Sequence, residues 1–175
     1  MKMRWQPSLQ IIPHYESEPL YIQAIVNSIN NKLSNINWKP DLILASYHGI
    51  PKKYFDKGDP YHCYCHKTSR LIKETFKKDI PILTTFQSRF GPQEWLQPYT
   101  DKTLENLPKE GKKNILVISP GFASDCVETL EEISIQGKES FLESGGEKFD
   151  TIPCLNDNED HIKLLVHLIN KSIRK

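Results

Sequence analysis

The residues best suited to catalysis or metal binding directly follow apolar runs of the chain. His48 stands in the segment Ser46-Tyr-His-Gly-Ile-Pro51, where glycine and proline force a turn directly after one such run. An imidazole at that place can accept a proton near neutral pH or bind a metal ion. It could instead hydrogen-bond the end of the strand and have no chemical role. Position and residue type leave both interpretations open.

A row of acidic residues follows another apolar run. Asp125, Glu128 and Glu132 are spaced i, i+3 and i+7, which would place three carboxylates on one face of a helix. Asp125 and Glu128 alone fit a capping box, because acidic groups are favoured in the first turn by the helix dipole. Capping does not explain Glu132. A row of this kind could also handle metal ions or conduct protons.

An aromatic loop follows a third apolar run. It reads Phe86-Gln-Ser-Arg-Phe-Gly-Pro92 and continues to Glu94-Trp95-Leu96. Aromatic rings beside the polar side chains of Gln87 and Ser88 suit the wall of a pocket for a flat, mostly apolar ligand. The alternative is a packed loop whose rings cover the edge of the sheet.

The segment His62-Cys-Tyr-Cys-His66 has the residue types of a zinc or iron–sulfur site. Its spacing argues against a site that uses both cysteines. On a helix beginning near Asp59-Pro60, Cys63 and Cys65 would point roughly 200° apart. Tetrahedral sites also usually place more residues between two cysteines. We therefore expect the two thiols not to share an ion.

The elements that must position these residues alternate along the chain. Short, nearly continuous apolar runs predict buried parallel strands at 41–47, 80–86 and 114–119, and weaker strands are predicted at 9–13 and 149–153. Helical spacing and capping signals predict helices at 20–33, 60–78, 99–107, 125–142 and 157–174. This order predicts an α/β fold, a Rossmann-like parallel sheet flanked by helices on both faces. Ligands of such sheets lie beyond the carboxyl ends of the strands.

Composition narrows the class of protein. A chain of 175 residues with 38% hydrophobic residues suits one folded domain. The balance of 23 basic and 22 acidic residues argues against a nucleic-acid-binding protein. No apolar run is long enough to cross a bilayer, and residues 1–7 lack the apolar segment of a secretory signal. We therefore expect a cytoplasmic protein whose four cysteines are free thiols.

Together the motifs resemble the C-terminal half of ferrochelatase, the family that inserts ferrous iron into protoporphyrin IX to form protohaem at the end of haem biosynthesis. The matching stretches, in the family's order and spacing, are 46–51, 58–61, 86–92 with Trp95-Leu96, 113–116 and 125–132. The resemblance implies that residues 1–175 form one C-terminal α/β domain, half of a two-domain chelatase fold. We expect the N-terminal half of the family, which supplies the other wall of the porphyrin cleft, to be absent from this chain.

The resemblance also implies roles for single residues. His48 matches a histidine proposed to accept pyrrole protons or to bind the incoming iron, and Glu128 matches the glutamate that faces it across the macrocycle. Asp125 and Glu132 match acids of a proposed proton or metal path. The residues expected to bind the porphyrin are Tyr47, Gln87, Ser88 and Trp95.

The resemblance implies Fe²⁺ as a substrate and no permanently bound cofactor. Some relatives hold a 2Fe-2S cluster through a cysteine-bearing C-terminal tail, which this sequence does not show, so we do not expect a cluster. Cys126 stands where many relatives have a second histidine, which puts a proton relay through that imidazole in doubt. A peripheral contact with the inner membrane is left open.

Two other functions stay open on the sequence alone. An enzyme with the same fold could insert another metal, such as cobalt, into another tetrapyrrole, because these motifs do not reveal metal selectivity. A half-cleft without its N-terminal partner could also bind a tetrapyrrole and not metallate it.

Overall fold

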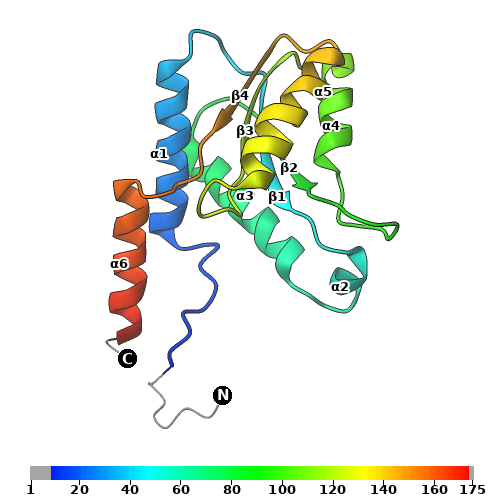
Figure 1. Cartoon of the computed structure of the whole chain (residues 1–175). Helices are drawn as coiled ribbons and strands as arrows, with labels where there is room; N and C mark the ends of the chain where they lie inside the picture. Colours follow the sequence, from blue (N-terminus) through cyan, green and yellow to red (C-terminus); the bar gives the residue numbers. More distant parts are fainter. Residues whose placement is uncertain (1–8, 174–175) are drawn as a thin grey trace.

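Strands and helices alternate in the computed structural model, which describes residues 9–173 (Figure 1). The strands of this part are β1 (Leu42–His48), β2 (Ile82–Gln87), β3 (Asn114–Ile118) and β4 (Lys148–Ile152). They form one sheet in the order β2-β1-β3-β4, and every pair is parallel. The predicted α/β fold is confirmed. The expectation about a secretory signal concerns residues 1–7, which lie outside the described residues.

Helices cover both faces of the sheet. The described elements are α1 (Pro19–Asn35), α2 (Lys52–Asp56), α3 (Tyr61–Phe76), α4 (Thr100–Asn106), the 3₁₀ turn η1 (Leu107–Glu110), the π-helix η2 (Glu128–Gly137), α5 (Lys138–Glu143) and α6 (Glu159–Ile173). One face packs on α1 and α3, with α6 packed against α1, and the other face packs on α4, η2 and α5 (Figure 1). Both faces of the strands are therefore buried, as the continuous apolar runs predicted.

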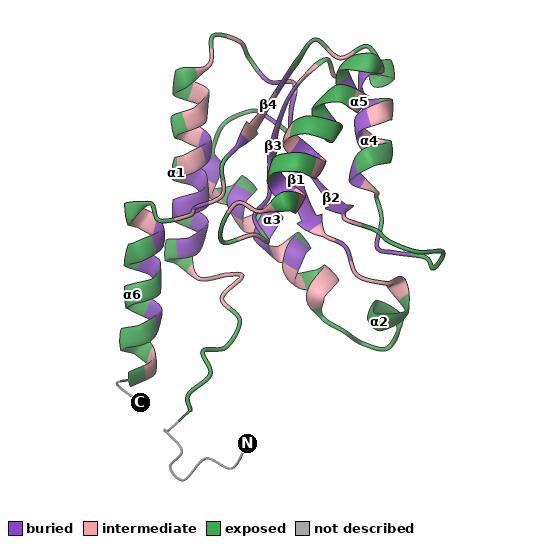
Figure 2. Cartoon of the chain, viewed as in Figure 1, coloured by how far each residue is buried: buried purple, intermediate pink, exposed green. Residues whose placement is uncertain are grey.

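Alternation along β1 divides the core in two. Ile43, Ala45 and Tyr47 join the cluster under α1 and α3, whereas Leu42 and Leu44 join the cluster under α4 and α5. The strands are the most deeply buried part of the chain, while α6 is largely exposed (Figure 2). Because successive side chains of a strand point to opposite faces, the parity of a residue decides which layer it meets.

Two sequence predictions are corrected by the structure, and one helix was missed. Residues 9–13 form no strand; they run beside α6, where the Gln10 Nε2 atom donates to the Ser172 carbonyl at 2.7 Å. A strand needs a free sheet edge next to it, and this segment has none. The helix predicted from residue 125 starts about two residues later and is a π-helix at first. The short helix α2 was not predicted.

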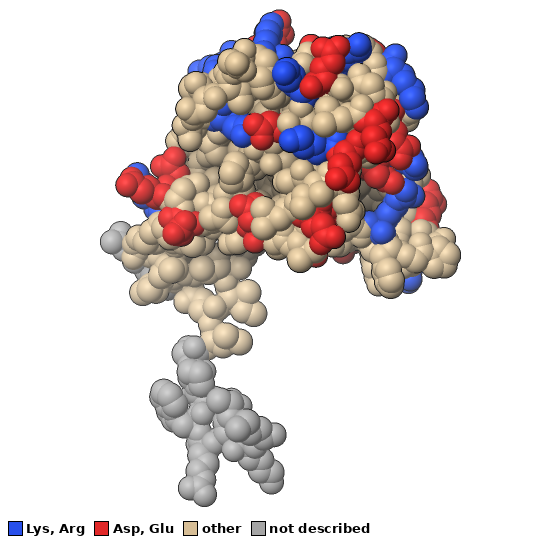
Figure 3. Space-filling view, turned by 45° about the horizontal axis from the view of Figure 1, so that its top comes forward, with Lys and Arg blue, Asp and Glu red and all other residues tan. Residues whose placement is uncertain are grey.

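The surface charges and the hydropathy of the helices agree with the expectations from the composition. Basic and acidic side chains are interspersed over the face shown in Figure 3. Within residues 9–173, no helix combines the length and the apolar character that a membrane span requires.

Glu16 connects the segment that precedes α1 with helix α3. Its carboxylate lies 2.6 Å from the His14 Nδ1 atom and accepts a hydrogen bond from the Lys67 Nζ atom at 3.0 Å. Its backbone carbonyl accepts another from the Thr68 hydroxyl at 2.9 Å. Burial alone raises the pKa of Glu16, but the hydrogen bonds from His14 and Lys67 outweigh it and lower the pKa from 4.5 to about 2.

We expect Glu16→Gln to lower the free energy of unfolding at pH 7 by about 1.5–3 kcal/mol, the range for hydrogen bonds to a charged group. A lowered folded-state pKa stabilises the protein above pH 4.5, and that contribution is lost as the pH falls toward 2. Urea unfolding at pH 7, 5, 4 and 3 should therefore show a difference that shrinks with acid. Glu74→Gln, at an exposed ion pair on α3, is the control. A difference that does not change with pH would contradict the assignment.

Candidate active site at the carboxyl end of the sheet

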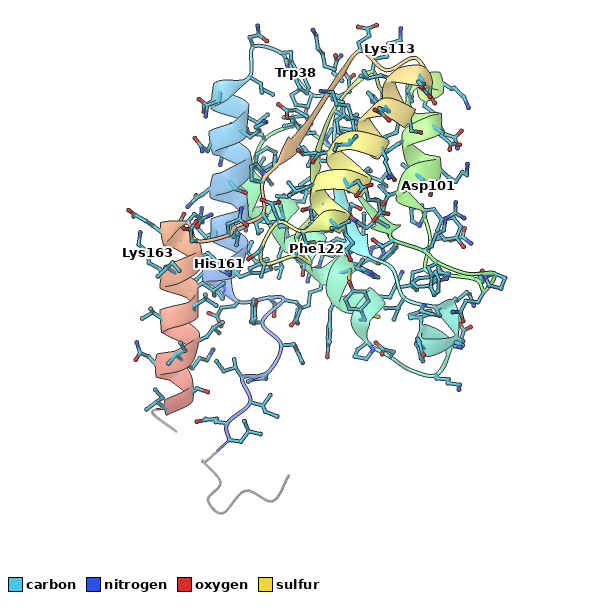
Figure 4. The ribbon with its side chains drawn as sticks, viewed as in Figure 1. Trp38, Asp101, Lys113, Phe122, His161 and Lys163 are labelled. Carbon is cyan, nitrogen blue, oxygen red and sulfur yellow. The ribbon has the colours of Figure 1, made fainter. Side chains whose placement is uncertain are left out.

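The predicted site residues gather at the carboxyl end of the sheet. Phe122 marks this end in Figure 4, and Lys113, just before β3, marks the opposite end. His48 is the last residue of β1 and is in register with Gln87, the last residue of β2. The Gly49 N–H donates to the Gln87 carbonyl at 2.8 Å, which continues the pairing for one residue past the strand. The two strand ends therefore hold His48 and Gln87 side by side.

Among residues 9–173, one ring nitrogen of His48 has a hydrogen-bond partner and the other has none. Its Nδ1 atom lies 2.6 Å from the Gly49 carbonyl oxygen. Because a carbonyl can only accept, Nδ1 carries the proton, and the neutral ring keeps its lone pair on Nε2. The Phe122 ring lies 6.2 Å from the imidazole, centroid to centroid, and the Tyr61 hydroxyl donates to the His48 carbonyl at 2.8 Å. The half-buried His48 thus presents a base or a metal ligand at the rim of the sheet.

Gly49 is required by the close approach of two segments. A Cβ atom at this position would lie 2.9 Å from the Gln87 carbonyl oxygen and 3.2 Å from the Trp95 ring. Leu96 N–H also donates to the Ile50 carbonyl at 3.0 Å, so the aromatic loop packs on the turn after His48. This contact positions the turn that carries the imidazole.

Glu128 lies on the same face of the sheet as His48. It is the first residue of η2, and its carbonyl accepts a hydrogen bond from the Gln87 Nε2 atom at 2.7 Å. The pKa of its carboxyl group is lowered by a hydrogen bond from the Cys126 side chain, by its own backbone N–H and by the charge of His48. Gln87, which is in register with His48 and donates to Glu128, thus connects the two residues, although the chain separates them by 80 positions.

Glu132 is anchored to the end of β2. Its two oxygens accept hydrogen bonds from the Ser88 backbone N–H at 2.7 Å and the Ser88 hydroxyl at 2.6 Å, and the Gln87 Nε2 atom lies at 3.3 Å. Ser88 adopts a φ of 61°, in the left-handed region. Gln87 is only 3% exposed and accepts a further hydrogen bond from Ser46. Gln87, Ser88 and Glu132 form one network that borders a cavity of about 510 Å³.

Asp125 precedes η2 and does not share its face, so the predicted row of three acids is wrong at this residue. Its carboxylate accepts hydrogen bonds from the Asn156 Nδ2 atom at 2.7 Å, the Thr129 hydroxyl at 3.1 Å and the Cys154 N–H at 3.2 Å. Burial alone raises the pKa of Asp125, but these bonds outweigh it and lower the pKa. Asp125 thus ties the start of η2 to the loop after β4.

Cys154 and Asn156 were missed by the sequence analysis. A signal for them exists, because both follow β4 directly, as His48 follows the apolar part of β1. Asn156 also has a φ of 46°, a backbone conformation that asparagine tolerates better than most residues.

Tyr47 and Trp95 are more buried than a pocket wall requires. Tyr47 is 2% exposed, and its hydroxyl lies 3.0 Å from the Ser69 hydroxyl. It borders a second, apolar cavity of about 260 Å³ on the α3 side of the sheet. Trp95 is 8% exposed, and its Nε1 atom donates to the Phe90 carbonyl at 2.9 Å. The structure therefore brings His48, Gln87, Ser88, Glu128 and Glu132 together and places Tyr47 on the opposite face.

Within residues 9–173, no three His, Cys, Asp or Glu side chains are grouped so that they could hold a metal ion. Cys63 is exposed on α3, whereas Cys65 is buried, and this burial raises the pKa of the Cys65 thiol to about 12. The two thiols therefore face different surroundings, as their spacing predicted.

Comparison with known proteins gives a consistent result over the whole chain. The family model described as ferrochelatase matches residues 1–173. The chain is 56% identical over 176 residues to the ferrochelatase of Rhizobium meliloti (strain 1021) and 54% identical over 176 residues to that of Allorhizobium ampelinum, and each match covers 99% of this chain and 51% of the relative. The ferrochelatase of Brucella anthropi is 52% identical over 175 residues, which are 99% of this chain and 50% of that relative. The chain spans about half the length of the curated relatives it matches.

Proposed function

This chain belongs to the ferrochelatase family, and we propose on that premise that it supplies one half of an enzyme that inserts Fe²⁺ into protoporphyrin IX. The main support is the pair formed by His48 and Glu128. Within the described residues, the His48 Nε2 atom has no hydrogen-bond partner, the Glu128 carboxyl group has a lowered pKa, and both residues lie beside Gln87 at the carboxyl end of the sheet. Protohaem, the product of the last step of haem biosynthesis, would form there.

The reaction exchanges two pyrrole protons for one Fe²⁺ ion and needs no redox step. His48 is the proposed base, because its Nε2 lone pair suits proton transfer near neutral pH. Glu128, ionised at neutral pH, would attract the ion from its water shell and partly offset the charge of the departing protons. Imidazole and carboxylate ligands together suit Fe²⁺ as a substrate that is held only briefly.

The remaining predicted residues would shape the site. Gln87 and Ser88 would hold the wall of the cavity beside the porphyrin, with Trp95 supporting the turn after His48. Asp125 and Glu132 are the candidates for passing protons or metal ions along the acidic side of the site. Their hydrogen bonds also support a second task, because both tie η2 to neighbouring strand ends.

The other wall of the cleft is proposed to come from the half of the relatives' length that this chain does not cover. In support, α6 exposes apolar side chains at helical spacing, and more lie in the segment beside it. With their exposed fractions these are Ile162 46%, Val166 51%, Ile169 48%, Ile173 72%, Leu9 83% and Ile11 80%. Exposed apolar side chains repeated along one helix are typical of a face that another part of a protein covers.

A chimera tests the proposed function. Residues 1–175 would replace the matching half of the Rhizobium meliloti ferrochelatase, and the purified protein would receive protoporphyrin IX and Fe²⁺ without oxygen. We expect haem to form at a rate within about tenfold of the parent enzyme, because 56% of the exchanged residues are identical. A folded chimera that forms no haem would contradict the proposal.

The same chimera separates the alternative functions. Fe²⁺ and Co²⁺ would each be offered with protoporphyrin IX and with sirohydrochlorin, and a preference for Co²⁺ and sirohydrochlorin would indicate a different chelatase. The 175-residue chain alone would also be titrated with protoporphyrin IX. A shifted Soret band without any metallation by the chimera would indicate a protein that only binds the tetrapyrrole.

A further inference from the structure

The first two turns of α3 bring two histidines together. His62 and His66 are four residues apart, which places them on one face of a helix. Their ring centroids lie 4.4 Å apart, with a tilt of 47° between the planes. They are the outer residues of the His-Cys-Tyr-Cys-His segment, so the structure joins its histidines while it separates its cysteines.

The ring nitrogens of these two histidines differ from those of the other four histidines of the chain. His14 and His167 pair with carboxylates, and His48 and His161 pair with backbone carbonyl oxygens. Among residues 9–173, His62 and His66 form no hydrogen bond or ion pair through their rings. Two adjacent imidazoles thus keep their nitrogen atoms available.

Aromatic packing holds the pair in place. The His62 ring lies 4.8 Å from the Phe55 ring and stacks on the Phe86 ring at 5.6 Å, with 22° between the planes. Phe86 is only 1% exposed, and its ring also lies 6.2 Å from His66. A rigid, buried residue therefore restricts His62, while the exposed His66 leaves the site open to solvent. A site restricted in advance loses less entropy when an ion binds.

We propose that His62 and His66 form a two-histidine site for a borderline divalent transition-metal ion such as Ni²⁺ or Zn²⁺, with water completing the coordination. Imidazole nitrogen is a ligand that these ions prefer. The lowered pKa of His66, caused by burial and by the charge of His62, agrees with a ring that is neutral at neutral pH. Because only two protein ligands take part, we expect a dissociation constant in the micromolar range.

The site is separate from the pair of His48 and Glu128. Phe86 belongs to the core cluster on the α3 side of the sheet. Its neighbour Gln87 points to the other side, where it contacts Glu128. A metal ion on α3 would therefore occupy a position that the proposed iron insertion does not use, and its binding does not depend on that function.

Isothermal titration of the 175-residue chain with Ni²⁺ at pH 7.5, purified without a polyhistidine tag, tests this proposal. His66→Ala should weaken binding at least tenfold. His62→Phe should do the same, while its ring keeps the stacking on Phe86 and so preserves the fold. The controls are His167→Ala, on α6, and Cys63→Ser, and neither should change the affinity.

Three outcomes would overturn the proposal. The first is the lack of any Ni²⁺ or Zn²⁺ binding at micromolar concentration by the folded chain. The second is an affinity that stays the same in both His66→Ala and His62→Phe. The third is a loss of metal affinity in Cys63→Ser as large as the loss in His66→Ala, which would assign the ion to the thiol instead. Circular dichroism of each variant would establish that it is folded.

Discussion

His48→Ala is expected to slow haem formation by about a thousandfold or more in the chimera that joins this chain to the other half of a relative. A positioned base contributes roughly 10²–10⁴-fold to a proton transfer. His48 would supply both the base and a ligand for the incoming ion, so the loss should lie in the upper part of that range. The measurement is the initial rate of haem formation from protoporphyrin IX and Fe²⁺ without oxygen.

A matched variant separates the role of Nε2 from the role of Nδ1. His48→Asn keeps an N–H group that can donate to the Gly49 carbonyl, as Nδ1 does at 2.6 Å, but it has no basic nitrogen. The turn should therefore stay in place while the base is lost. We expect His48→Asn to be as slow as His48→Ala. Rates near that of the parent chimera in either variant would remove His48 from the mechanism.

The main strands could be predicted because their signals are local and strong. Residues such as Leu44 and Leu116 are fully buried, and the continuous apolar runs that contain them have few other stable arrangements. The strand predicted at 9–13 was wrong because its signal is not sufficient by itself. Its residues are compatible with a strand, but a strand also needs a partner edge, and the position of that edge depends on the rest of the fold.

The π-helix η2 was beyond local reasoning. The spacing of Asp125, Glu128 and Glu132 is regular enough for an α-helix, and no residue type in the segment demands a wider turn. The helix instead meets the sheet through tertiary contacts, such as the one between the Ser134 hydroxyl and the Thr151 hydroxyl on β4, 3.1 Å apart. Contacts of this kind connect distant residues and leave no local signal.

The location of the candidate site followed from the fold class, but its inner arrangement did not. The rule for parallel sheets directed attention to the strand ends, where the structure places His48 and Gln87. Alternation along a strand also implies that Tyr47 and His48 point to opposite faces, so adjacency in the sequence is a poor guide to a shared pocket. The porphyrin-binding role of Tyr47 stays a prediction, and its burial against Ser69 limits its contact with a ligand.

Glu132→Ala is expected to lower the free energy of unfolding by about 3 kcal/mol, because it removes charged acceptors from partly buried donors. The Ser88 N–H and hydroxyl would both lose their partner, and Gln87 would lose one of its contacts. Urea unfolding of the 175-residue chain measures the change. Glu131→Ala, at the exposed neighbouring position of η2, should stay within about 0.5 kcal/mol of the parent chain.

A second substitution of Glu132 distinguishes a structural anchor from a path for protons or metal ions. In Glu132→Gln the side-chain oxygen can still accept from the Ser88 N–H, whereas the negative charge is gone. If Glu132 acts mainly as an anchor, the chimera carrying Glu132→Gln should lose much less of its rate of haem formation than the chimera carrying Glu132→Ala. If Glu132 instead passes protons or metal ions, Glu132→Gln should slow haem formation strongly while the free energy of unfolding changes little. The hydrogen bonds from the Ser88 N–H and hydroxyl lead us to expect the first result, because they hold the carboxylate in one position between η2 and the end of β2.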